Sequence, residues 1–131
     1  MFTHLMNEEE KNKFLELVYK ISKIDGEYAE EEEELINSYK QELGLEVIAD
    51  TAPINELIGY FANKAKELKR IVVFEVYGMI LADDKIEKNE EKVLNEIRTE
   101  FNFEEDELEE ILSLVKRLQN VYDDIYNVIF K

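Results

Sequence analysis

Two acidic motifs with identical spacing contain the residues of this chain that are best suited to chemistry. In the first motif Asp25 precedes Glu32 by seven residues, and in the second Asp83 precedes Glu90 by seven residues. Each Asp lies at the end of an expected helix, and each Glu lies in the first turns of the next. A short turn can bring both carboxylates of a motif to the same side of the loop, so the sequence predicts two similar acidic loops.

Three kinds of role fit these four carboxylates. Ca²⁺ and Mg²⁺ bind several carboxylate or carbonyl oxygens, so two neighbouring loops could pool their side chains in one metal site made of Asp25, Glu32, Asp83 and Glu90. In a structural role, the Asp side chains accept loop N–H groups and the Glu side chains stabilise helix N-termini. Catalysis by a paired acid and base, as in a carboxylate-based hydrolase, would need a nucleophile or metal beside them, and no other feature of the sequence supports it.

The scarcity of histidine and cysteine excludes several other kinds of site. His4 is the only histidine and there is no cysteine. Zinc sites, thiol catalysis, Ser-His-Asp triads and di-iron bundles therefore lack residues that they need. A complete EF-hand is not expected either, because its first and third ligands would be Ile21 and Lys23 in one motif and Met79 and Leu81 in the other.

The charge of the chain limits its partners. The 131 residues include 32 acidic and 16 basic side chains, and the net charge is −16. This charge repels nucleic acid and anionic membrane surfaces, and it favours cations and basic protein surfaces. The chain contains no apolar run of about 18 residues, and its first residues, MFTHLMNEEE, do not resemble a signal peptide. We therefore expect a cytoplasmic protein without direct membrane insertion.

Apolar residues at helical spacing predict the elements that position the loops. Helices are expected at about 8–23, at 35–43 after the acidic run 30–34, at 54–65, around 93–101, and at 108–129 with a break near Asn120. Asn7 with Glu10 forms a capping pair for the first helix, Gly44 is a stop signal for the second, and Pro53 precedes the third. Taken alone, the apolar segment 71–82 fits a buried strand as well as a helix.

An internal repeat decides between these two alternatives. A shift of 58 places aligns residues 24–36 with residues 82–94, with Asp on Asp and Glu on Glu, and no gap is needed over more than thirty positions. The same shift places Val76 and Tyr77 of the apolar segment on Val18 and Tyr19, which belong to a clear amphipathic helix. The apolar segment should therefore be helical too.

The expected fold class is all-α. The chain should form a compact bundle of about six or seven helices, in a single domain over residues 1–131. Two pseudo-symmetric helix–acidic loop–helix repeats, at about 8–46 and 66–104, would pack about an approximate two-fold axis. That axis would place Asp25 close to Asp83.

The two motifs resemble those of the tellurite-resistance TerB-like family. The resemblance is carried by Ile24-Asp25-Gly26-Glu27-Tyr28 with Glu32, and by Ala82-Asp83-Asp84-Lys85-Ile86 with Glu90. It implies a helical domain with an anionic patch that binds divalent cations, associated with stress-response and membrane-linked protein assemblies. Asp84 stands where the family has Gly, and Lys85 reduces the local negative charge, so the resemblance implies unequal binding by the two loops.

The expected function is that of a non-enzymatic, TerB-like acidic domain. Under the first interpretation, the domain binds Ca²⁺ or Mg²⁺ weakly and no organic cofactor, or acts as a stress-response interaction module. Under the alternative interpretation, it is a metal-free protein–protein interaction module whose acidic face binds a basic or membrane-associated protein partner. Titration with divalent cations distinguishes the two interpretations.

Overall fold

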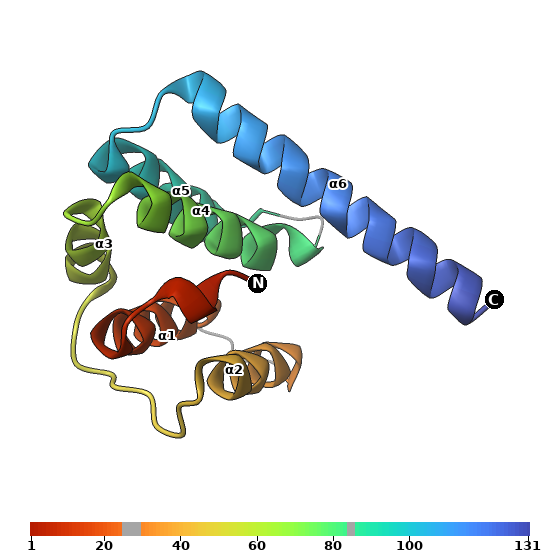
Figure 1. The fold of residues 1–131 in the computed structure, drawn as a ribbon, viewed down its shortest axis with the longest axis horizontal. Helices are drawn as coiled ribbons and strands as arrows, with labels where there is room; N and C mark the ends of the chain where they lie inside the picture. Colours follow the sequence, from red (N-terminus) through yellow and green to blue (C-terminus); the bar gives the residue numbers. More distant parts are fainter. Residues whose placement is uncertain (25–29, 84–85) are drawn as a thin grey trace.

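The computed structural model describes residues 1–24, 30–83 and 86–131, apart from the side chains of Glu31 and Asp83. Within these ranges the chain is all-helical, with six α-helices and no strand, as the sequence predicts (Figure 1). In chain order the elements are the 3-10 helix η1 (Thr3–Leu5), α1 (Glu8–Ser22), α2 (Glu30–Leu43), α3 (Ile54–Ala62), α4 (Lys66–Ile80), the 3-10 helix η2 (Leu81–Asp83), α5 (Lys88–Phe101) and α6 (Glu105–Ile129).

Local signals set the ends of the first two helices where the sequence predicts them. The Asn7 side chain accepts the backbone N–H of Glu10 at 2.8 Å, and the Glu10 carboxylate accepts the N–H of Asn7 at 2.9 Å. This reciprocal pair satisfies two N–H groups that the first turn of α1 leaves open. After α2, Gly44 adopts a φ of +70°, and the N–H of Leu45 returns to the carbonyl of Lys40 at 2.9 Å. Gly carries no Cβ penalty in this left-handed conformation.

The apolar run of residues 71–82 is helical over most of its length, which confirms the prediction from the repeat. It belongs to α4, where Val72, Val73, Val76 and Ile80 are all buried. The β-branched residues of this run do not force a strand, because α4 contacts α3, α5 and α6 and is therefore apolar on several sides.

Two predictions about the helices are wrong, the end of the third helix and the break in the last one. The third helix ends at Ala62 and not at residue 65, where the Asn63 side chain donates to the carbonyl of Gly59 at 3.0 Å and satisfies a terminal acceptor. The last helix does not break near Asn120, since α6 is continuous from Glu105 to Ile129. An exposed Asn lowers the stability of a helix by less than about 0.7 kcal/mol relative to Ala. The packing of the apolar face of α6 outweighs this loss.

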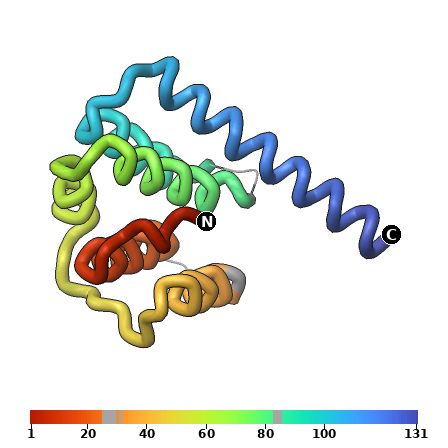
Figure 2. The backbone as a smooth tube through the Cα atoms, viewed as in Figure 1, coloured from red at the N-terminus to blue at the C-terminus, as the bar shows by residue number. Residues whose placement is uncertain are grey.

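In Figures 1 and 2, α3 lies at one end of the bundle and the projecting part of α6 lies at the other. The short α3 contacts α1, α4 and α5, while α6 packs most extensively against α4. A single buried core runs through α1 to α5 and the first half of α6. The second half of α6 extends beyond the other helices and ends at the C-terminus, and every residue from 121 to 131 is exposed.

The helix bounds follow the shift of the sequence repeat. Lys66, which begins α4, lies 58 residues after Glu8, which begins α1; the two helices also end 58 residues apart. The same relation holds for α2 and α5. Whether the two pairs superpose about a two-fold axis stays a prediction, together with the proximity of Asp25 to Asp83.

Candidate functional site

Two of the four predicted cation ligands have side chains that the structure describes. Glu32 and Glu90 are the third residues of α2 and α5, and both are half-buried. The Glu90 carboxylate accepts the backbone N–H of Glu87 at 3.0 Å, which satisfies a donor at the start of α5. Asp25 lies outside the described residues, and Asp83 is described only by its backbone, as the last residue of η2.

The hydrogen bond of Glu90 matches the structural role considered from the sequence. Over residues 1–24, 30–83 and 86–131, no group of three or more His, Cys, Asp or Glu side chains is arranged to hold a metal ion. A pooled site of four carboxylates depends on Asp25 and Asp83, whose side chains lie outside that description. The cation site therefore stays a prediction.

A buried carboxylate on α1, which the sequence interpretation missed, organises the loop before α3. Glu16 is 1% exposed, and its Oε2 atom accepts the backbone N–H groups of Thr51 and Ala52, each at 2.8 Å. Buried carboxylates are tolerated when N–H donors replace water in this way. The signal in the sequence was an acidic residue flanked by Leu15 and Leu17 on an apolar helix.

A second buried carboxylate, also missed, joins α4 to α2 and the N-terminus. Glu75 accepts the hydroxyl hydrogen of Tyr39 at 3.1 Å and contacts the amine of Met1, which also donates to Glu42 at 3.1 Å. Burial, and then the charge of Glu75, raise the pKa of Tyr39, so its hydroxyl stays protonated and donates. The lone acid in the apolar run from residue 71 to 82 was the available signal. Both buried carboxylates are thus occupied by structural donors.

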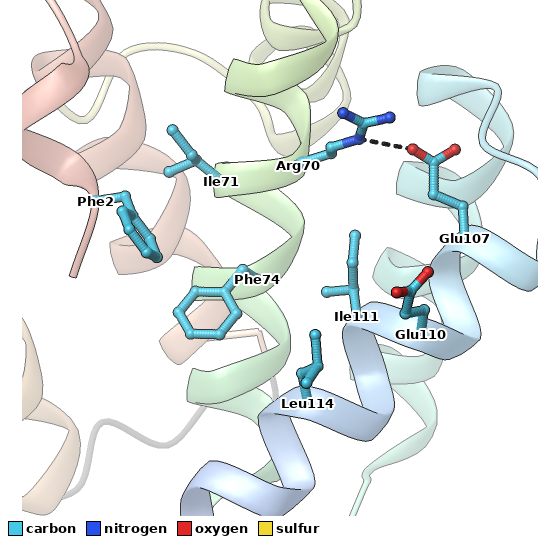
Figure 3. A pocket seen from close by; sticks show the side chains of 8 residues that line it. All are labelled: Phe2, Arg70, Ile71, Phe74, Glu107, Glu110, Ile111 and Leu114. Carbon is cyan, nitrogen blue, oxygen red and sulfur yellow. Dashed lines mark hydrogen bonds and ion pairs between the residues drawn. The ribbon is translucent and has the colours of Figure 1, made fainter.

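An apolar cavity lies between the N-terminal segment, α4 and α6, and is here called the α4–α6 cavity (Figure 3). It encloses about 390 Å³ and is lined by Phe2, Arg70, Ile71, Phe74, Glu107, Glu110, Ile111 and Leu114. The rings of Phe2 and Phe74 meet edge to face, with centroids 6.0 Å apart. Apolar side chains from three separate segments therefore converge on one opening.

Charged residues stand at one side of this cavity. Arg70 donates to Glu107 at 2.7 Å (Figure 3). The Nζ atom of Lys66 lies 3.5 Å from the same carboxylate. The hydrogen bond from Arg70, aided by the charge of Lys66, holds the pKa of Glu107 below its usual range. Glu110 is exposed beside the apolar lining. The rim thus combines a neutralised carboxylate with an exposed acidic residue.

A second, smaller hollow of about 270 Å³ lies between α2, α4 and α6. Phe74 lines both hollows, and the walls of the second include Leu35 of α2, Met79 of α4 and Leu118 of α6. Gln119 of α6 donates to the backbone carbonyl of Gly78 on α4 at 3.1 Å, across this hollow. The two hollows therefore adjoin at Phe74, and both lie against α4.

Comparison of the chain with models of known protein families, with curated proteins and with solved structures gave no match. The resemblance to the TerB-like family stays a prediction. None of the helices in the described ranges is both long enough and apolar enough to cross a membrane.

Proposed function

We propose that this chain is a non-enzymatic protein-interaction domain that binds a basic, amphipathic helical segment of another protein at the α4–α6 cavity. The observation that carries the proposal is the apolar lining of that cavity, where Phe2 and Leu114 are exposed, Phe74 is half-buried, and the exposed carboxylate of Glu110 lies beside them. Such a surface suits an apolar anchor residue surrounded by positive charge.

The apolar part of the argument concerns size and composition. Binding energy at protein interfaces concentrates in a few large side chains that fill pockets. The cavity, at about 390 Å³, falls in the lower range of ligand pockets, and Ile71, Phe74 and Ile111 supply apolar walls. An apolar side chain from a partner helix would remove these walls from water.

The electrostatic part of the argument concerns the type of partner. A chain with a net charge of −16 attracts basic segments and repels acidic ones, which affects both encounter rate and specificity. At the rim, Arg70 and Lys66 already balance Glu107, whereas Glu110 is exposed. A basic helix can place a lysine or arginine near Glu110 while its apolar face enters the cavity.

A synthetic amphipathic helix of leucine and lysine tests this proposal. We expect it to bind the protein at least about tenfold more tightly than a scrambled peptide of the same composition, because only the first presents a continuous apolar face. Leu114→Glu should weaken binding by about tenfold or more, since it places a charge in the apolar lining. Isothermal titration calorimetry at low and high salt measures both effects.

A matched control separates the cavity from general negative charge. Val47 is 77% exposed, in the segment between α2 and α3, and does not line the cavity. Val47→Glu adds the same charge as Leu114→Glu and should leave peptide affinity unchanged. Equal binding of the two peptides, or equal affinity of the two variants, would contradict the proposed cavity site.

The acidic motifs support a second candidate function, divalent-cation binding of the TerB-like kind. The specific observation in its favour is that Glu32 and Glu90 occupy the same position in helices whose bounds differ by the repeat shift. The equivalent positions of Glu32 and Glu90 support the pooling of Asp25, Glu32, Asp83 and Glu90 around one hard cation.

Thermal melts test the cation-binding candidate. At a hundredfold excess over its dissociation constant, Ca²⁺ or Mg²⁺ bound to the native state alone would stabilise it by roughly 2.7 kcal/mol. The melting temperature should therefore rise more than in sodium chloride at equal ionic strength. Asp25→Asn should remove most of this gain, and Asp83→Asn less, because Lys85 already weakens the second loop. An identical response by the wild type and the double variant would assign the carboxylates a structural role.

A further inference from the structure

We propose that two copies of this chain associate through the second half of α6, which pairs with itself in antiparallel orientation. This interface is separate from the α4–α6 cavity. The starting observation is a single apolar stripe along α6, with alternating spacings of three and four residues. Its first four positions are Leu108, Ile111, Val115 and Leu118, and its last three are Tyr122, Ile125 and Ile129.

The two halves of this stripe differ in how they are covered. The first four residues are buried or half-buried against the body of the protein. Tyr122, Ile125 and Ile129 continue the same face, but they are 59%, 48% and 66% exposed. Tyr122 borders the second hollow, between α2, α4 and α6. The pattern that seats α6 on α4 then continues along the half of the helix that leaves the body (Figure 1). A stripe with this spacing is suited to pairing with another helix.

The exposed apolar area of this segment is comparable with the area that a standard interface buries. Val121, Tyr126 and Val128 flank the stripe and are also at least half exposed. These three residues and the last three of the stripe together expose on the order of 700 Å² per copy, close to the roughly 800 Å² per partner of a standard interface. Contiguous apolar patches of this size are unusual on a monomer.

The charge of the second half of α6 favours a second copy of the chain as its partner over the basic helix proposed for the α4–α6 cavity. Residues 116–131 contain three basic and two acidic side chains, whereas the whole chain has a net charge of −16. The acidic pair Asp123 and Asp124 and the basic pair Lys116 and Arg117 occupy the helical positions opposite the stripe. The apolar face itself is therefore uncharged, and it fits another uncharged apolar face. The same segment of a second copy provides one.

The negative charge of the rest of the protein favours antiparallel over parallel pairing of the two helices. The strongly acidic body lies along the first half of α6 (Figure 1). Parallel pairing would place two acidic bodies side by side, whereas antiparallel pairing places them at opposite ends of the helix pair. In the antiparallel register Tyr122 faces the partner's Ile125, and the partner's Ile129 lies beside the half-buried Leu118 at the edge of the second hollow. The contact is self-complementary, as a two-fold interface must be.

Sedimentation analysis and cysteine cross-linking test the proposal. The wild type should be a dimer at concentrations of about 100 µM and above. Ile125→Asp should weaken association by about a hundredfold or more, because the two-fold axis introduces the charge twice in one apolar contact. Ile125→Ala retains helix propensity and should also weaken association, while Val47→Asp should remain dimeric. Circular dichroism verifies that each variant keeps its helix content.

The orientation has its own test, since the chain lacks cysteine. When Tyr122→Cys and Ile125→Cys chains are mixed and oxidised, antiparallel pairing should yield mainly the mixed disulfide. A wild type that stays monomeric at all concentrations, or an Ile125→Asp variant that still dimerises like the wild type, would overturn the interface. Mainly unmixed disulfides would overturn the antiparallel arrangement. Peptide binding at the cavity, probed with Leu114→Glu, can fail or succeed independently of these results.

Discussion

Replacing Phe61 with alanine is expected to destabilise the protein by about 4 kcal/mol, because the change removes a fully buried aromatic ring and leaves a cavity. Phe61 is 0% exposed and lies on α3. The short α3 contacts α1 on one side and α4 and α5 on the other. Its packing therefore joins the two halves of the bundle. Urea unfolding followed by circular dichroism measures the loss of unfolding free energy.

The same substitution at an exposed ring is the control for Phe61→Ala. Phe2 is 44% exposed, and Phe2→Ala should cost about 1 kcal/mol or less. Phe61→Leu, which preserves most of the buried volume, should fall between the two. Similar losses for Phe61→Ala and Phe2→Ala would show that α3 does not hold the bundle together.

Glu16→Ala is expected to cost about 3 kcal/mol, because it leaves two backbone N–H groups without their acceptor. Both groups, from Thr51 and Ala52, donate to one oxygen of Glu16 at 2.8 Å. The substitution also releases the segment that leads into α3. The fall in unfolding free energy should appear together with faster proteolysis between α2 and α3.

Glu16→Gln provides the comparison that identifies the cause. Glutamine retains an oxygen that can accept both N–H groups, so Glu16→Gln should lower the free energy of unfolding by only about 1 kcal/mol. Glu33 is exposed on α2 and Glu33→Ala should have little effect. If the Gln and Ala variants at position 16 lost equal stability, hydrogen-bond acceptance would not be the reason for the buried carboxylate.

Much of the fold could be predicted from the sequence because its signals are local. The capping pair of Asn7 and Glu10 and the left-handed Gly44 act within a few residues of themselves. The repeat supplied what local propensity could not, since residues 71–82 alone were ambiguous. The break predicted near Asn120 was wrong because a polar residue on the outer face of an amphipathic helix does not interrupt its backbone hydrogen bonds.

The candidate site was less predictable, because its contacts join distant parts of the chain. The donors to Glu16 lie 35 and 36 residues away, and no pattern near Glu16 specifies them. The α4–α6 cavity requires Phe2 to reach Phe74, which no sequence periodicity indicates. The acidic motifs stood out in the sequence, yet two of their four side chains lie outside the part of the chain that the structure describes.

The seating of α6 on α4 also has a consequence for how the projecting half of the helix forms. An isolated helix must overcome an unfavourable nucleation step, and helices shorter than about 12–15 residues are marginal in water. The seated half, held by Leu108 and Val115, supplies the nucleus. The projecting half then needs only propagation, one residue at a time. Because α6 is one continuous helix, the apolar face of the projecting half keeps the direction that the seated half imposes.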